Sequence, residues 1–129
     1  GHLYQVYLGL TTWVEHNGMT FDYRYYKERI HQLCRSINQT FLMPGLSPYL
    51  SYDQDDTYCY FTFNHKRIPF LPEDVTVLPL TNITVEELSR WFVTELIQDR
   101  DELNRHRIEK VVVKVFSAPG QSASHTWPS

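Results

Sequence analysis

The sequence has little of what marks a membrane, secreted or nucleic-acid-binding protein. No apolar run approaches the roughly 20 residues that a helix needs to cross a bilayer, and no secretory signal pattern opens the chain. Twelve Lys and Arg against 15 Asp and Glu give a net charge of −3, so the chain as a whole does not attract nucleic acid or an anionic membrane. A cytoplasmic protein is therefore expected, with neither nucleic acid nor a membrane as its partner.

Cysteine is also scarce, with only Cys34 and Cys59 in the chain. Cys34 falls on the apolar side of a predicted helix and Cys59 within an aromatic strand, so two buried, reduced thiols are expected rather than a disulfide. What the chain does contain is 42% hydrophobic residues, with 15% aromatic residues, in a length of 129. This composition and length predict one folded domain over residues 1–129 with a single core.

The spacing of apolar residues predicts two amphipathic helices. The first begins behind Asp22 as its N-cap and ends near Ile37, with apolar residues three and four apart on one side. The second begins at Thr84, whose hydroxyl and the carboxylate of Glu87 form a predicted capping box. The apolar positions of the two helices are Tyr26, Ile30, Leu33, Cys34 and Ile37, then Leu88, Trp91, Phe92 and Leu96.

Aromatic and β-branched runs predict the strands. Pro69 and Pro72 limit the second arm of a central hairpin to an edge position or a short pairing. Dense charge over 98–110 predicts the end of the second helix and a solvated loop. Antiparallel strands around two amphipathic helices indicate an α+β fold, in which both helices pack on one face of the sheet. The expected strands are 3–14, 57–63, 67–71, 75–80 and 110–117, with a polar turn over 15–18.

Short motifs, in a fixed order, carry a resemblance to a known family. Residues 1–6 (Gly-His-Leu-Tyr-Gln-Val) match G-H-N-Y-x-V, and residues 18–22 (Gly-Met-Thr-Phe-Asp) match a G-M-x-x-D helix start. Residues 83–88 (Ile-Thr-Val-Glu-Glu-Leu) follow T-T-E-N-L, and 117–119 (Ser-Ala-Pro) stand where the family has E-[ST]-P. On these residues the chain resembles the 6-pyruvoyl-tetrahydropterin synthase / 6-carboxy-tetrahydropterin synthase family.

The resemblance implies the tunnelling fold (T-fold), in which the sheets of neighbouring subunits join into a barrel. The expected partners are further copies of the chain, as a trimer or hexamer, or a tandem repeat, with a pterin-like small molecule as ligand. Family enzymes hold a catalytic zinc with three histidines, and His2 would be the last of these ligands. The strand that carries the other ligands is expected to lie before residue 1. One histidine cannot form a site that needs three protein ligands, so zinc is expected to be absent from this chain as given.

The resemblance also shows where the family's reacting groups would stand. The Asp-His pair that follows the first helix is replaced by Asn38 and Gln39, which cannot exchange protons but still form hydrogen bonds. The glutamate that accepts two N–H groups from the pterin is replaced by Ser117. Thr84 and Glu86 survive from the T-T-E motif as candidate substrate contacts, although a carboxylate in the first helical turn also has a structural role beside the helix dipole.

Three functional hypotheses remain open at this point. The first is a catalytically degenerate domain of this family, a subunit or repeat with a structural or ligand-binding role. The second is an active pterin-forming lyase whose zinc site is completed by residues outside this chain or by a partner. The third is a regulatory pocket for another heterocycle. Metal content and turnover distinguish the second from the others.

Overall fold

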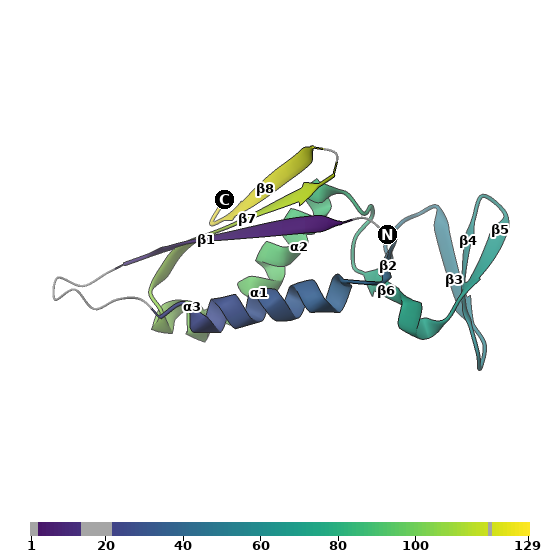
Figure 1. The fold of residues 1–129 in the computed structure, drawn as a ribbon, viewed down its shortest axis with the longest axis horizontal. Helices are drawn as coiled ribbons and strands as arrows, with labels where there is room; N and C mark the ends of the chain where they lie inside the picture. Colours follow the sequence, from purple (N-terminus) through teal and green to yellow (C-terminus); the bar gives the residue numbers. More distant parts are fainter. Residues whose placement is uncertain (1–2, 14–21, 119) are drawn as a thin grey trace.

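A computed structural model describes residues 3–13, 22–118 and 120–129 of the chain. Figure 1 shows α1 and α2 below the sheet formed by β1, β7 and β8, and a second sheet, β3–β4–β5, at the far end of the long axis. None of the helices in these ranges is long and apolar enough to cross a membrane. In chain order the elements are β1 (Tyr4–Thr12), α1 (Arg24–Ile37), β2 (Phe41–Pro44), β3 (Leu50–Gln54), β4 (Cys59–Phe63), β5 (Lys66–Phe70), η1 (Pro72–Asp74), β6 (Val75–Leu78), α2 (Val85–Leu96), α3 (Arg100–Arg105), β7 (Ile108–Ser117) and β8 (Gln121–Trp127).

The main sheet has the order β1-β7-β8 and is antiparallel throughout. Val111, Val113 and Val115 alternate along β7 and are each 0% exposed, since this face of the strand packs against the helices. From α2, Leu88 and Phe92 are also 0% exposed within the same core. The predicted α+β architecture, with both helices on one face of an antiparallel sheet, is confirmed.

Several local predictions are confirmed and others are wrong. The hairpin of β4 and β5 forms around Asn64 and His65, both with positive φ. The segment 98–110, predicted as a helix end and a solvated loop, contains the short helix α3, because the Asp99 carboxylate accepts the Glu102 N–H at 3.1 Å and caps a new turn. Strands β2, β3 and β8 were not predicted either. The predicted polar turn over 15–18 lies outside the described residues.

The start of α1 also differs from the prediction. Tyr23, not Asp22, is the N-cap residue, and it makes no side-chain cap. The Asp22 carboxylate instead accepts the backbone N–H of Arg24 at 3.0 Å and pairs with the guanidinium of Arg24 at 2.8 Å. This side-chain hydrogen bond, followed by the backbone N–H, lowers the pKa of Asp22 to about 2. The two thiols, Cys34 half-buried and Cys59 buried, are free as predicted.

Thr84 caps α2 as the sequence predicts. The hydroxyl of Thr84 accepts the backbone N–H of Glu87 at 3.1 Å. The Glu87 carboxylate is engaged by the guanidinium of Arg90 in the same helix. The forward half of the predicted capping box is therefore observed, and Glu87 contributes an ion pair to the first turns.

Replacement of Thr84 by alanine is expected to lower the free energy of unfolding by about 1 kcal/mol, because a first-turn N–H loses its acceptor. Urea denaturation of the two proteins would measure the difference. Thr94→Ala is the matched control, since Thr94 is exposed later in the same helix and makes no cap. It should change the stability by less than about 0.5 kcal/mol. Equal losses in the two variants would contradict the capping role.

Tyr26 places a hydroxyl in the core without a partner. The residue is 1% exposed, and its hydroxyl has no hydrogen-bond partner within the described part of the chain. Its ring meets those of Tyr25 and His106 edge-on, with centroids 4.9 Å and 5.6 Å away. Burial raises the pKa of Tyr26 to about 12, so the hydroxyl is neutral at physiological pH.

Tyr26→Phe is therefore expected to stabilise the protein by about 1 kcal/mol, because it removes an unsatisfied buried hydroxyl and keeps the ring contacts. The shift of the thermal or urea midpoint measures the effect. Tyr25→Phe, at a ring that is 38% exposed, is the control and should be close to neutral. A clear loss of stability in Tyr26→Phe would mean that its hydroxyl has a partner in solution.

Candidate functional site

Asn38 and Gln39 form the corner at which the chain leaves α1. Asn38 is the C-cap residue in an extended conformation, and Gln39 has φ 64°, in the left-handed region that non-glycine residues rarely adopt. Both residues are exposed. The corner is held from behind, since the Thr76 hydroxyl donates to the Ser36 carbonyl at 3.2 Å and lies 2.8 Å from the Thr40 hydroxyl.

Ser117 lies at the end of β7, where it pairs in register with Tyr4 at the start of β1 and with Gln121 of β8. It is half-buried. Burial also raises the pKa of the neighbouring Tyr4 hydroxyl. Because Ser117 is opposite Tyr4, it is at the end of the sheet from which the chain continues back toward His2. His2, the predicted zinc ligand, is itself outside the described residues.

Thr84 and Glu86 lie at the start of α2, and both are exposed. The hydroxyl of Thr84 is occupied by its capping bond. Glu86 is in the first turn, where a carboxylate interacts favourably with the positive end of the helix dipole. Both positions are thus explained by helix structure, and the exposed carboxylate of Glu86 is the one group here that could still meet a ligand.

The predicted site residues come from three different elements: the end of α1, the start of α2 and the end of β7. Figure 1 shows the tip of β7, the start of β1 and the C-terminal end of α1 at the same end of the long axis, toward β2 and β6. Within the described residues no hydrogen bond or ion pair joins the side chains of Asn38, Gln39, Thr84, Glu86 and Ser117 to one another. These side chains are therefore not linked to one another within the described residues, and the hydroxyl of Thr84 is engaged in capping α2.

Zinc is the metal that the resemblance implies. In residues 3–13, 22–118 and 120–129, no three His, Cys, Asp or Glu side chains come close enough to hold a metal ion. A catalytic zinc takes three protein ligands with nitrogen, sulfur or carboxylate donors. The donor set of these residues therefore does not fit zinc by itself.

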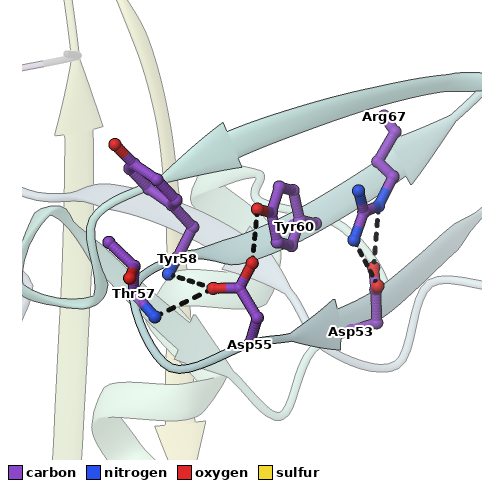
Figure 2. A network of polar contacts seen from close by, with 6 residues as sticks. All are labelled: Asp53, Asp55, Thr57, Tyr58, Tyr60 and Arg67. Atoms are coloured by element: carbon purple, nitrogen blue, oxygen red, sulfur yellow. Dashed lines mark hydrogen bonds and ion pairs between the residues drawn. The ribbon is translucent and has the colours of Figure 1, made fainter.

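Sequence reasoning missed a polar network on the sheet β3–β4–β5, shown in Figure 2. The Arg67 guanidinium pairs with the Asp53 carboxylate at 2.6 Å and lies over the Tyr60 ring, 3.5 Å from its centroid. The Tyr60 hydroxyl donates to the Asp55 carboxylate at 2.7 Å, and that carboxylate also accepts the backbone N–H of Tyr58 at 2.7 Å. The closely spaced acidic residues at 53–56 were the only sequence signal for it.

The Asp55 carboxyl is expected to titrate far below its usual range. The Tyr58 N–H, then the Tyr60 hydroxyl and the Thr57 N–H, lower its pKa to about 2. A carboxyl with a depressed folded-state pKa favours folding above its unfolded pKa of about 3.9, and this contribution is lost as the pH falls through about 2. An NMR titration of the side chain should give a midpoint near 2 in the native protein and a higher one in Tyr60→Phe. A native midpoint near 4 would contradict the network.

Known proteins are similar to this chain in sequence and in structure. The chain is 24% identical over 104 residues to a Methanocaldococcus jannaschii protein provisionally named a 6-carboxy-5,6,7,8-tetrahydropterin synthase. The match covers 81% of this chain and 64% of that relative, so the chain spans less than two thirds of the relative's length. No family model matches the chain.

Solved structures of two 6-pyruvoyl tetrahydropterin synthases resemble the chain along almost its whole length. The Plasmodium falciparum protein has a TM-score of 0.86 and the Plasmodium vivax protein 0.87, each with 23% sequence identity, covering 97% of this chain and 78% of theirs. Variants of the Plasmodium vivax protein, in which a catalytic glutamate is replaced by alanine or cysteine, match equally well. The chain thus has the fold of the 6-pyruvoyl tetrahydropterin synthases, the T-fold, and its sequence is similar to that of a relative provisionally named a 6-carboxy-5,6,7,8-tetrahydropterin synthase.

Proposed function

We propose that the chain is a catalytically degenerate subunit or repeat of a T-fold assembly, with a structural or ligand-binding role. The corner after α1 is the observation that supports this proposal most. Asn38 and Gln39 stand there at the positions where the family resemblance expects Asp and His, and both are exposed to solvent. Neither amide takes up or releases a proton near neutral pH, so this corner offers no general acid or base.

Ser117 also supports the proposal, because its side chain is a weaker partner for a pterin than a carboxylate. The end of β7 is where the resemblance expects a carboxylate for the pterin, and a carboxylate can accept two parallel N–H groups in a charge-assisted pair. Ser117 offers one neutral hydroxyl at that place. A pterin-like molecule would therefore be held more weakly than in an enzyme of the family, with Thr84 and Glu86 as the remaining family positions near the helix start.

The edges of the main sheet support an assembly of several copies. Within the described residues, β1 and β8 each pair with β7 on one side only. Unpaired edges of long strands readily accept another strand. In the proposed assembly, further copies of this single T-fold domain, as a trimer or hexamer, or a tandem partner, cover these edges. The two free thiols fit a cytoplasmic protein.

Metal analysis and a turnover assay test the proposal. The purified protein is expected to bind zinc far below one equivalent and to leave dihydroneopterin triphosphate unconverted, even when zinc is added. The Plasmodium vivax synthase, assayed in parallel, controls for substrate quality. One zinc per chain together with turnover would contradict the proposal. It would favour an active lyase whose site is completed by residues outside this chain or by a partner.

A further inference from the structure

The sheet β3–β4–β5 has one apolar face. The register places Tyr52, Phe61 and Ile68 side by side in one row across the three strands. Since side chains alternate along a strand, the rows two residues away in each direction belong to the same face. One of these rows is Leu50, Phe63 and Lys66, and the other is Gln54, Cys59 and Phe70. Seven of these nine side chains are apolar; we call them the apolar face.

The opposite face of the same sheet is polar. It carries Asp53, Tyr60 and Arg67, whose charges and hydroxyl are paired with one another and with Asp55 (Figure 2). The polar face is therefore satisfied by its own contacts and can remain in water. Among the residues that the structure describes, the exposed side chains of the apolar face are not covered by a further apolar layer.

Large side chains of the apolar face remain in contact with solvent. Tyr52 is 52% exposed, Phe63 55% and Ile68 47%, while Phe61 at the centre is 3% exposed because the rings of Tyr52 and Phe70 flank it. Phe41 of β2, 52% exposed, extends the surface, since its ring centroid lies 5.4 Å from that of Phe70. Contiguous apolar surface of this kind on a small protein marks an interaction site.

We propose that the apolar face docks against the apolar face of a second copy of this chain, as two sheets packed face to face. A two-fold axis in the plane between the sheets brings apolar rows together. Lys66, the one charged residue of the face, then lies opposite Leu50 or Phe70 of the other copy, according to the direction of the axis. Neither arrangement sets lysine against lysine. The face contains no carboxylate that would select a basic partner instead.

The exposed area is of the size that such a contact needs. Aromatic side chains of about 200 Å² and the exposed fractions above give about 400 Å² for Tyr52, Phe63, Ile68 and Phe41 on each copy. Two copies then bury about 800 Å² from these side chains alone. The half-buried Leu50 and Phe70 raise the total toward the roughly 1,000–1,200 Å² at the lower end of specific interfaces.

The β5 edge of this sheet is unfavourable for the addition of a further strand. The edge strand β5 carries Lys66, Arg67 and Pro69, and charged residues and proline on an edge prevent pairing with a further strand. The face-to-face contact is thus separate from any closure of the main sheet through β1 and β8. It also goes beyond the proposed function, because it does not depend on whether a pterin binds.

Sedimentation velocity on two charge-matched variants tests the contact. Phe63→Glu in β4 with Ile68→Glu in β5 places two carboxylates in the apolar face. Ser51→Glu in β3 with Thr62→Glu in β4 places two carboxylates on the opposite face of the same sheet. The first variant is expected to have half the particle mass of the unchanged protein at the same concentration, and the second to keep that mass. Circular dichroism checks that both variants are folded.

Crosslinking provides a second measurement that tolerates weak folding of the carboxylate variants. Ile68→Cys treated with a short bismaleimide should form covalent dimers at several times the yield of Ser51→Cys, and both variants share the native Cys34 and Cys59 as background. Equal yields, or a particle mass that does not differ between the two charge variants, would overturn the proposal. A protein that stays monomeric at about 100 μM would overturn it too, and would point to a different protein as the occupant.

Discussion

Replacement of Phe92 by alanine is expected to lower the free energy of unfolding by about 3–5 kcal/mol. Phe92 is 0% exposed in α2, within the core that α2 shares with β7, and its ring meets Trp91 edge-on at 5.0 Å. Alanine removes most of the buried apolar surface and leaves a cavity that the packed strand cannot fill. Urea denaturation monitored by circular dichroism measures the loss.

The size of this effect matters because domains of this length are stable by only about 5–15 kcal/mol. Phe116→Ala is the matched control. Phe116 is 37% exposed, and its neighbour Val115, pointing the other way on β7, is buried. The control should cost about 1 kcal/mol or less, since little cavity is created. Similar losses for Phe92 and Phe116 would mean that the helices do not rest on the sheet as the structure shows.

A carboxylate restored at the end of β7 is expected to raise pterin affinity by a large factor. Ser117→Glu would provide the charged acceptor pair for two N–H groups, worth about 2–5 kcal/mol, which corresponds to about 30-fold to several thousand-fold in Kd. Isothermal titration with an unreactive pterin measures it. Ser117→Gln is the control, because it has the same shape without the charge, and it should gain far less.

The triple variant, with Asn38→Asp and Gln39→His added to Ser117→Glu, tests whether the proposed pterin pocket is present. If the pocket is intact but lacks its charged groups, the carboxylate at 117 should account for the gain in affinity, and the pair at 38 and 39 should add a proton relay without much further binding. If neither Ser117→Glu nor the triple variant binds a pterin better than the Gln control, the pocket does not have the family's geometry. That outcome is separate from turnover by the unchanged protein, which would contradict the degenerate role directly.

The strongest predictions from sequence concern elements whose signals are local. The cap at Thr84 and the apolar residues three and four apart that follow it predict α2, and all of these signals lie within the helix itself. The turn at Asn64 and His65 is equally local, because both residues tolerate the positive φ that a tight hairpin needs. The family resemblance likewise depends on short motifs that a single pass along the chain can find.

The missed elements depend on partners far away in the chain. Strand β2 pairs in parallel with β6, with Phe41 opposite Val75, and four residues have too little pattern of their own to predict this. Strand β3 is a similar case, since its polar residues follow no obvious alternation until Phe61 of β4 lies beside Tyr52. Helix α3 was not predicted because its charged residues are equally typical of a solvated loop. Its start is marked by the hydrogen bond from the Glu102 N–H to the Asp99 carboxylate.

For the proposed site, the sequence by itself determined which groups stand at the positions that the resemblance indicates: Asn38, Gln39 and Ser117 lack acidic or imidazole side chains whatever the fold. Only the tertiary structure decided how they are presented, with Gln39 in a left-handed corner and Ser117 half-buried opposite Tyr4. The same holds for the unpartnered hydroxyl of Tyr26 and the apolar face of β3–β4–β5. Side-chain chemistry is a property of each residue, whereas burial, pairing and exposure arise from contacts between segments that the linear sequence does not bring together.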